Sequence, residues 1–149
     1  MKLIHHLTRL PSVAVWGLGL ALLSGCGRAR EPWETVYPAS GEITFKGRPL
    51  KNAELSFHPL DDIVPETVRP WAKTGDSGEF VLSTYNQGDG APSGRYKVTA
   101  VHHEIVVSKG GGMGVKPNNL PGKYASKDTT DWIIEIAEGE TKIPRRELK

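Results

Sequence analysis

The sequence has one cysteine, no excess of either charge after its first 25 residues, and no apolar run longer than eleven residues. A single cysteine excludes an internal disulfide, so the fold must be stabilised by the burial of apolar side chains. After residue 25 the chain carries 17 basic and 17 acidic residues. This balance argues against a nucleic-acid partner, which normally requires a basic face. An eleven-residue run is also too short for a membrane-spanning helix, which needs about 20 apolar residues.

Helical periodicity is missing as well, whereas glycine and proline are plentiful. The 149 residues include 17 glycines and 11 prolines, a composition typical of turn-rich β proteins. The length suits one domain with a substantial core and is short for two. We therefore expect a single all-β domain.

The N-terminal segment has the order of features found in a secretory signal. Lys2 and Arg9 precede the apolar run at residues 13–23, and no acidic residue accompanies them. The next residues, Leu23-Ser24-Gly25-Cys26, resemble the bacterial lipobox. In that motif the bond before the cysteine is cleaved, a diacylglyceryl group is attached to its thiol, and the freed amine is acylated, with palmitate as the expected acyl group.

The lipobox resemblance implies cleavage between Gly25 and Cys26 and lipidation of Cys26. Two or more acyl chains hold a protein firmly to a membrane, whereas one chain binds marginally. We therefore expect residues 1–25 to be a lipoprotein signal peptide and residues 26–37 a tether. The domain would be anchored to a membrane outside the cytoplasm, on the periplasmic face or the cell surface. The alternative is an uncleaved hydrophobic anchor with an incidental cysteine.

Alternation of apolar and polar residues from Val36 onward predicts short strands separated by turns. The expected strands are 42–46, 53–58, 71–74, 80–84, 95–107, 132–136 and 141–148. In the strand 95–107 the apolar alternation changes phase, and a bulge between Val101 and Glu104 would turn both apolar sets inward. Residues 108–122 are expected to form a long mobile loop, and Pro144 predicts an edge strand or a bulge. Together these segments predict an antiparallel β-sandwich of about seven strands over residues 38–149.

Several segments resemble the carboxypeptidase-regulatory-like, or transthyretin-like, domain. They are "YPASGEITFKGRPLKNAELSFHP", "TGDSGEFVLST" and "PSGRYKVTAV". The segment "LPGKYASKDTTDWIIEIAEGE" is similar to the C-terminal part of small bacterial lipoproteins that carry this domain. The resemblance implies an Ig-like or transthyretin-like sandwich. The residues of its motifs are those that form turns and those that alternate into the core, so they specify a fold rather than an activity.

Two clusters of polar residues are candidate metal sites. Asp76-Ser77-Gly78-Glu79 offers oxygen ligands for calcium, but the apolar residues that follow supply no more of them. A hairpin turn, with Asp76 bonding backbone amides and Gly78 at positive φ, is the favoured interpretation. His102 and Glu104 share a strand face and offer two metal ligands without an evident third. The glycine run at 110–114 lacks the lysine and the helix of a phosphate-binding loop and predicts a flexible loop.

Four aromatic residues are candidates for a sugar-stacking surface, or alternatively for the core: Trp71, Tyr85, Tyr124 and Trp132. No G-x-S-x-G motif is present. The chain also lacks the tail of transthyretin-like hydroxyisourate hydrolases and the iron ligands of intradiol dioxygenases. We therefore expect a non-enzymatic binding or structural module without a cofactor. Its expected partners are the membrane, through the lipid on Cys26, and an envelope protein or polysaccharide. The alternatives are a carbohydrate-binding accessory module and a metal-binding protein around His102 and Glu104.

Overall fold

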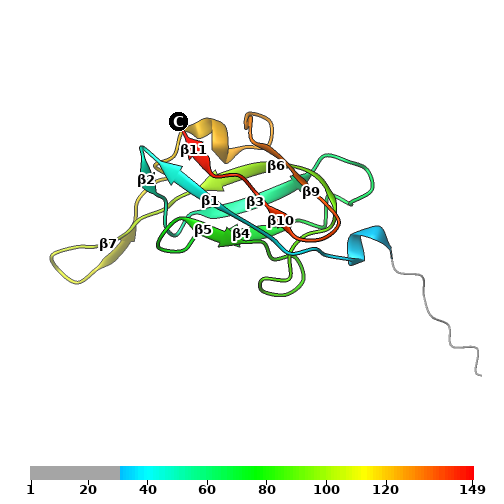
Figure 1. The fold of residues 1–149 in the computed structure, drawn as a ribbon. Helices are drawn as coiled ribbons and strands as arrows, with labels where there is room; N and C mark the ends of the chain where they lie inside the picture. The colour runs from blue at the N-terminus through cyan, green and yellow to red at the C-terminus, as the bar shows by residue number, and fades with distance from the viewer. Residues whose placement is uncertain (1–30) are drawn as a thin grey trace, which may run out of the picture.

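Two β-sheets pack face to face in the computed structural model, which describes residues 31–149 (Figure 1). The expected signal peptide, Gly25 and Cys26 lie outside the described residues. The first sheet is built around β1 (Ala39–Phe45), and its other strands are β2 (Arg48–Pro49), β5 (Glu79–Val81), β10 (Thr141–Lys142) and β11 (Arg146–Leu148). The second sheet has the order β4 (Trp71–Lys73), β3 (Glu54–Pro59), β6 (Gly94–Val101) and β9 (Ile133–Ile136). The predicted all-β sandwich is confirmed.

The core lies between the inner faces of the two sheets, where alternation places one apolar side chain every second residue. The buried side chains include Ile43, Phe57, Phe80, Tyr96 and Val98. The rings of Phe57 and Phe80 meet across the sheets with centroids 6.3 Å apart. The hydroxyl of Tyr96 donates a 2.8 Å hydrogen bond to the carbonyl of Pro92, and burial raises the pKa of this phenol.

The C-terminal segment differs from the predicted single strand at 141–148. It is divided into β10 and β11, because Ile143 to Arg145 interrupt the pairing around Pro144. Both strands run parallel to β1, with Ala39 opposite Thr141 and Ile43 opposite Arg146. The expectation of a fully antiparallel sandwich is therefore wrong at this edge. Residues 31–149 contain eleven short strands rather than about seven, because two expected strands are each divided and β2 and β8 were not expected.

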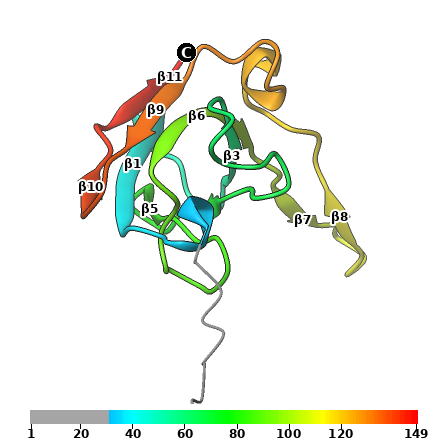
Figure 2. The same cartoon turned by 90° about the vertical axis from the view of Figure 1, so that its right-hand side faces the viewer.

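The chain leaves the sandwich after β6. Residues Ile105–Val107 (β7) and Met113–Val115 (β8) form a two-stranded hairpin that pairs with neither main sheet. Figure 2 shows this hairpin projecting from the body of the molecule. The predicted bulge that would turn Ile105 and Val107 inward is wrong, because both side chains are exposed. The predicted loop at 108–122 is also wrong in part, because β8 is a strand.

Residues just before 38, within the expected tether, also contact the sandwich. A short 3₁₀ turn, η1 (Pro32–Glu34), lies within the expected tether, and Tyr37 exchanges backbone hydrogen bonds of 2.8 and 3.0 Å with Ala91. The hydroxyl of Tyr85 donates to the carbonyl of Trp33 at 2.6 Å. A second 3₁₀ turn, η2 (Gly122–Ala125), precedes β9. Within residues 31–149 no helix has the length and apolar character needed to cross a bilayer.

Candidate functional site

A groove of about 960 Å³ lies at the end of the sandwich where the hairpin is attached. One wall is the Arg48–Asn52 segment, which follows β1. The floor includes Glu54 and Lys73, which are opposite one another in the register of β3 and β4. The other wall is the hairpin base, from His102 to Ile105 together with Val115. The groove therefore joins four segments that are distant in the sequence.

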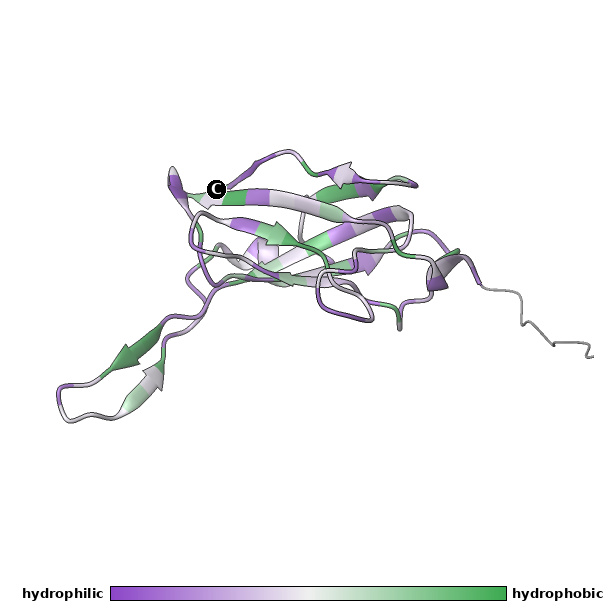
Figure 3. Ribbon diagram, turned by 60° about the horizontal axis from the view of Figure 1, so that its bottom comes forward, coloured by the Kyte–Doolittle hydropathy of each residue, from purple (hydrophilic) through white to green (hydrophobic). Residues whose placement is uncertain are grey.

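The hairpin presents an apolar face that contributes to the groove. Ile105 is directly opposite Val115, and Val107 is directly opposite Met113. Directly opposite residues of an antiparallel pair point to the same side of the sheet, so these four side chains form one surface, here called the apolar face. Their exposed fractions are 68%, 69%, 70% and 76%. Figure 3 shows the hydrophobic colouring of the projecting strands.

Hydrogen bonds at the hairpin base connect it to the segment that follows β8. The backbone N–H of His102 donates to Asn118 Oδ1 at 2.9 Å, and the N–H of Asn119 donates to the His102 carbonyl at 3.2 Å. The N–H of Lys116 donates to the Glu104 carbonyl at 2.9 Å. His103 Nδ1 lies 3.1 Å from the Lys116 carbonyl. These contacts hold the two segments at the base of the hairpin together.

Some charged side chains around the groove have a close partner of opposite charge, whereas others have none among the described residues. Lys116 Nζ lies 2.8 Å from Glu104 Oε2, and this hydrogen bond lowers the pKa of Glu104. Lys51 Nζ lies 3.9 Å from Asp76 Oδ1, a distant and exposed pair. Arg48 and Lys73 have no carboxylate within 4 Å in residues 31–149. The groove thus presents exposed cationic groups opposite the apolar face.

His102 and Glu104, the predicted metal pair, both line the groove but have other partners. His102 Nδ1 lies 2.9 Å from Asn119 Oδ1, and the Glu104 carboxylate contacts Lys116 Nζ and Asn119 Nδ2. Within the described part of the chain, no group of three His, Cys, Asp or Glu side chains is arranged to hold a metal ion. The donor set therefore does not fit a metal centre.

The four predicted aromatic residues do not form one surface. Tyr124 and Trp132 are 1% and 3% exposed, so their assignment to a ligand surface is wrong. Trp132 immediately precedes β9 and its carbonyl accepts from the N–H of Val98, which places it within the second sheet and over the core. Trp71 and Tyr85 are about half exposed, on two segments that the bridge between Trp71 and Ser83 joins, and Tyr85 is also bonded to the N-terminal turn.

The turn at 75–79 is confirmed as a turn, with one correction. Gly78 has φ +79°, and a Cβ at this position would lie 2.3 Å from the Ile43 carbonyl oxygen. The carboxylate that accepts the Ser77 N–H, at 2.9 Å, belongs to Glu79. Asp76, the predicted acceptor, is exposed. The turn lies against β1, because the N–H of Ile43 donates to the Gly78 carbonyl at 2.9 Å.

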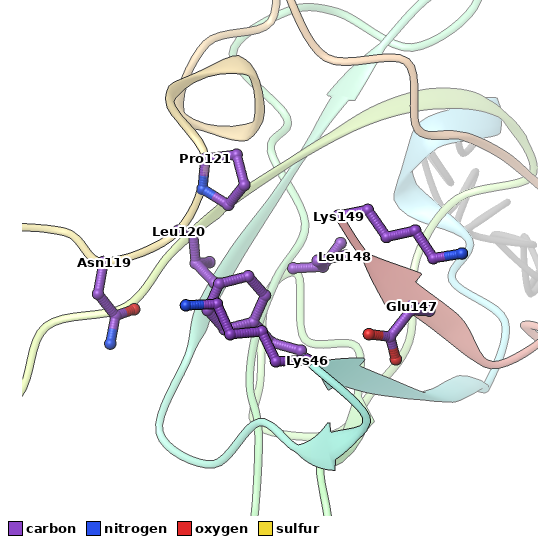
Figure 4. Close-up of a pocket in the computed structure, with 8 residues that line it drawn as sticks. Lys46, Asn119, Leu120, Pro121, Glu147, Leu148 and Lys149 are labelled. Carbon is purple, nitrogen blue, oxygen red and sulfur yellow. The ribbon is translucent and has the colours of Figure 1, made fainter.

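A second hollow of about 400 Å³ lies beside the groove, between β11 and the segment before η2 (Figure 4). Glu147 and Leu148 line one side, and Asn119 and Leu120 line the other. The Glu147 carboxylate accepts from the Thr44 hydroxyl and, at 3.0 Å, from the Gly47 N–H. These bonds, the Thr44 bond first, lower the pKa of Glu147. The carboxylate is therefore used in joining β11 to the β1–β2 turn.

The groove and its apolar face were missed by reasoning from the sequence. One signal was available, since the pairs Ile105/Val107 and Met113/Val115 alternate on either side of a glycine-rich turn. Such a pattern is typical of a hairpin.

Comparisons with known proteins give no family assignment: no family model and no curated protein matches the chain. Solved structures to which it is similar include a 9R-lipoxygenase from Cyanothece (15% identity, 77% of this chain and 17% of that one, TM-score 0.39). A second is a DUF3823 family protein from Parabacteroides merdae, with 12% identity over 76% of this chain and 45% of that one and a TM-score of 0.39. A third is a proposed carbohydrate binding protein from Pseudomonas aeruginosa, with 13% identity over 76% of this chain and 92% of that one and a TM-score of 0.40. The chain spans less than half the length of the first two. Similarities of this size define no function for the chain.

Proposed function

We propose that this protein is an exported, lipid-anchored binding module that uses the groove and the apolar face without catalysing a reaction. The observation that carries the proposal is the apolar face, whose four side chains project into solvent beside a cationic groove. Monomeric proteins rarely expose contiguous apolar surface unless it has a binding role. The hydrogen-bonded hairpin base supports this role, because it holds the two strands together and so keeps the four side chains on one surface.

The position of the groove suits an anchor at Cys26. Figures 1 and 3 show that η1 and the hairpin lie at opposite ends of the sandwich. β1 runs between these ends, from Ala39 near η1 to the β1–β2 turn, and Arg48 after that turn lines the groove. The chain from Cys26 to Glu31 spans at most about 18 Å when fully extended. A lipid on Cys26 would therefore hold the η1 end near the membrane and direct the groove away from it.

The chemistry of the groove supports binding rather than catalysis. Its lining side chains are cationic, amide, imidazole, carboxylate and aliphatic, and none is a serine, threonine or cysteine. Glu104 is neutralised by Lys116, so it is poorly suited to act as a general base. Such a surface is suited to recognising a partner through apolar contact and charge.

Anchoring is tested by comparing the wild type with Cys26→Ala in a bacterial host, with Ser24→Ala as a control that keeps the cysteine and a small residue before it. We expect the wild type and the control in the membrane fraction, with the intact mass of a chain that begins at Cys26 and carries lipid. Cys26→Ala should lose the lipid and the processing. An unmodified thiol in a cytosolic chain that begins at Met1 would overturn the anchoring part of the proposal.

Binding at the apolar face is tested in cells by a photoreactive amino acid at Val107, compared with one at Ile133, which is exposed on β9. We expect a discrete cross-linked product from position 107 and none from position 133. Equal products from both positions, or none from either, would overturn the binding role of the apolar face.

A further inference from the structure

We infer that the groove binds an extended segment of a partner protein in which apolar residues alternate with acidic ones. The inference rests on the proposed binding function and names the chemical class of the partner. The groove has two unlike walls, and the side chains of an extended strand alternate between two directions. A strand lying in the groove would therefore place one set of side chains on the apolar face and the other set toward the cationic wall.

The apolar face has the form required for one side of such a strand. Ile105 and Val115 both line the groove and are neighbours across the hairpin, and Val107 and Met113 continue the same surface toward its tip.

The opposite wall and the floor of the groove carry cations that select acidic side chains. Arg48 has no acidic neighbour within 4 Å among the described residues, and Lys73 has only Glu54 opposite it in the strand register. Glu104, the other acidic residue of the groove, is already paired with Lys116. Arg48, Lys51 and Lys73 outnumber Glu54, so the net charge available to a ligand is positive. An acidic segment would form ion pairs with these cations, whereas a basic segment would be repelled.

A lipid bilayer fits the hairpin less well than a strand does. The hairpin tip is Ser108-Lys109-Gly110-Gly111-Gly112, so insertion by the tip would carry a charge and exposed backbone into the bilayer first. The apolar residues lie along the flank of the hairpin. Under the proposed anchoring, this end also points away from the membrane.

A second copy of the chain also fits poorly. A stable pair of proteins buries about 800 Å² on each partner, and four aliphatic side chains supply only a fraction of that area.

The test uses fluorescently labelled synthetic peptides and the purified mature domain. One peptide alternates valine with glutamate, the second alternates valine with lysine, and the third has the composition of the first with its valines in one block. We expect the alternating acidic peptide to bind, and the other two to bind at least about tenfold more weakly, as measured by fluorescence anisotropy. The double variant Ile105→Ser, Val115→Ser should lose this binding, and Ile133→Ser should retain it.

The charge requirement is tested by Arg48→Glu, with Arg69→Glu as the matched control at an exposed arginine outside the groove. We expect Arg48→Glu to weaken the acidic peptide about tenfold and to improve binding of the lysine peptide. All these positions are on the surface, and circular dichroism with thermal unfolding verifies that each variant is folded. Equal binding of the three peptides, or no binding, would overturn the inference.

Two further measurements exclude the other occupants. Binding to phosphatidylglycerol vesicles that depends on Ile105, or self-association in sedimentation that depends on Ile105, would also overturn it. If no peptide binds but position 107 still gives a cross-linked product in cells, this class of partner is rejected and the proposed binding function is retained. Loss of the cross-linked product as well would reject the proposed function itself.

Discussion

The sandwich and the β7–β8 hairpin use the same sequence pattern with opposite results. Ile134 and Ile136 alternate along β9 and are buried, whereas Ile105 and Val107 alternate along β7 and are 68% and 70% exposed. The difference is the presence of a second sheet, because a strand buries one face only where another element covers it. Alternation therefore shows that a strand has an apolar face, while the partner that covers it must come from elsewhere.

The hairpin lacks the stabilisation that the burial of apolar side chains gives to the sandwich. Burying one aliphatic side chain contributes about 1.5–3 kcal/mol, and the hairpin leaves four such side chains exposed. An isolated two-stranded hairpin is marginally stable in water, so it needs the hydrogen bonds at its base, which Asn119 and Lys116 donate and Asn118 accepts. A region that gives up burial but retains defined geometry is more easily explained by binding than by stability.

The largest expected effect lies in the sandwich. Phe57→Ala removes a fully buried ring that contacts Phe80, so we expect the free energy of unfolding to fall by about 3–5 kcal/mol. Denaturant unfolding followed by tryptophan fluorescence measures this change. Met113→Ala in the hairpin should change it by less than about 0.5 kcal/mol. Similar losses for both variants would break the distinction between the two regions.

Two glycines provide a sharper comparison, because they share a backbone conformation but differ in surroundings. Gly78 at φ +79° lies against the Ile43 carbonyl, whereas Gly111 at φ +81° has no atom within 4 Å of an added Cβ. We expect Gly111→Ala to cost about 1 kcal/mol, from the conformational strain of a positive φ at the exposed tip alone. Gly78→Ala should cost about 1–3 kcal/mol, because β1 must also move. Equal costs in chemical denaturation would show that the turn is not seated on β1 as described.

The sequence predicts much of the sandwich and little of the site. The buried side chains of β1, β3 and β9 and the positive φ of Gly78 follow from local alternation and turn chemistry. The parallel pairing of β10 and β11, the departure of the hairpin and the burial of Tyr124 and Trp132 do not, since each depends on which distant segment lies opposite. The groove has the same dependence, because its walls come from segments far apart in the chain. Lipidation of Cys26 stays a prediction.

Lowering the pH should affect the stability of the sandwich and of the hairpin separately, because each region contains one carboxylate with a lowered pKa. Hydrogen bonds from Thr44 and Gly47 lower the pKa of Glu147, and the hydrogen bond from Lys116 lowers that of Glu104, both from an ordinary value of 4.5. A carboxylate whose pKa is lower in the folded state contributes stability above its unfolded pKa and loses this contribution as the pH falls through the folded pKa. Both contributions are therefore complete at neutral pH and decline below about pH 4.5.

The two carboxylates are expected to act on different parts of the molecule. Glu147→Gln should flatten the dependence of global unfolding on pH below about 4.5, because Glu147 joins β11 to the β1–β2 turn. Glu104→Gln should instead reduce amide hydrogen-exchange protection at the hairpin base, with little change in global unfolding. Lys97→Gln, on the outer side of the second sheet, serves as a surface control. Coupled changes in both regions would show that the hairpin and the sandwich unfold as one unit.

The smallest expected effect on stability is also the most informative. Ile105→Ala should change the free energy of unfolding by less than about 0.5 kcal/mol, whereas Ile136→Ala, the same substitution at a side chain 1% exposed, should cost about 2–5 kcal/mol. The order should reverse for binding of the alternating valine–glutamate peptide, which Ile105→Ala should weaken and a folded Ile136→Ala should leave unchanged. If Ile105→Ala is as destabilising as Ile136→Ala, the hairpin packs on the sandwich in solution and its apolar face is part of the core. If neither property changes, the face is inert, because a side chain that contributes to neither folding nor binding has no role in the groove.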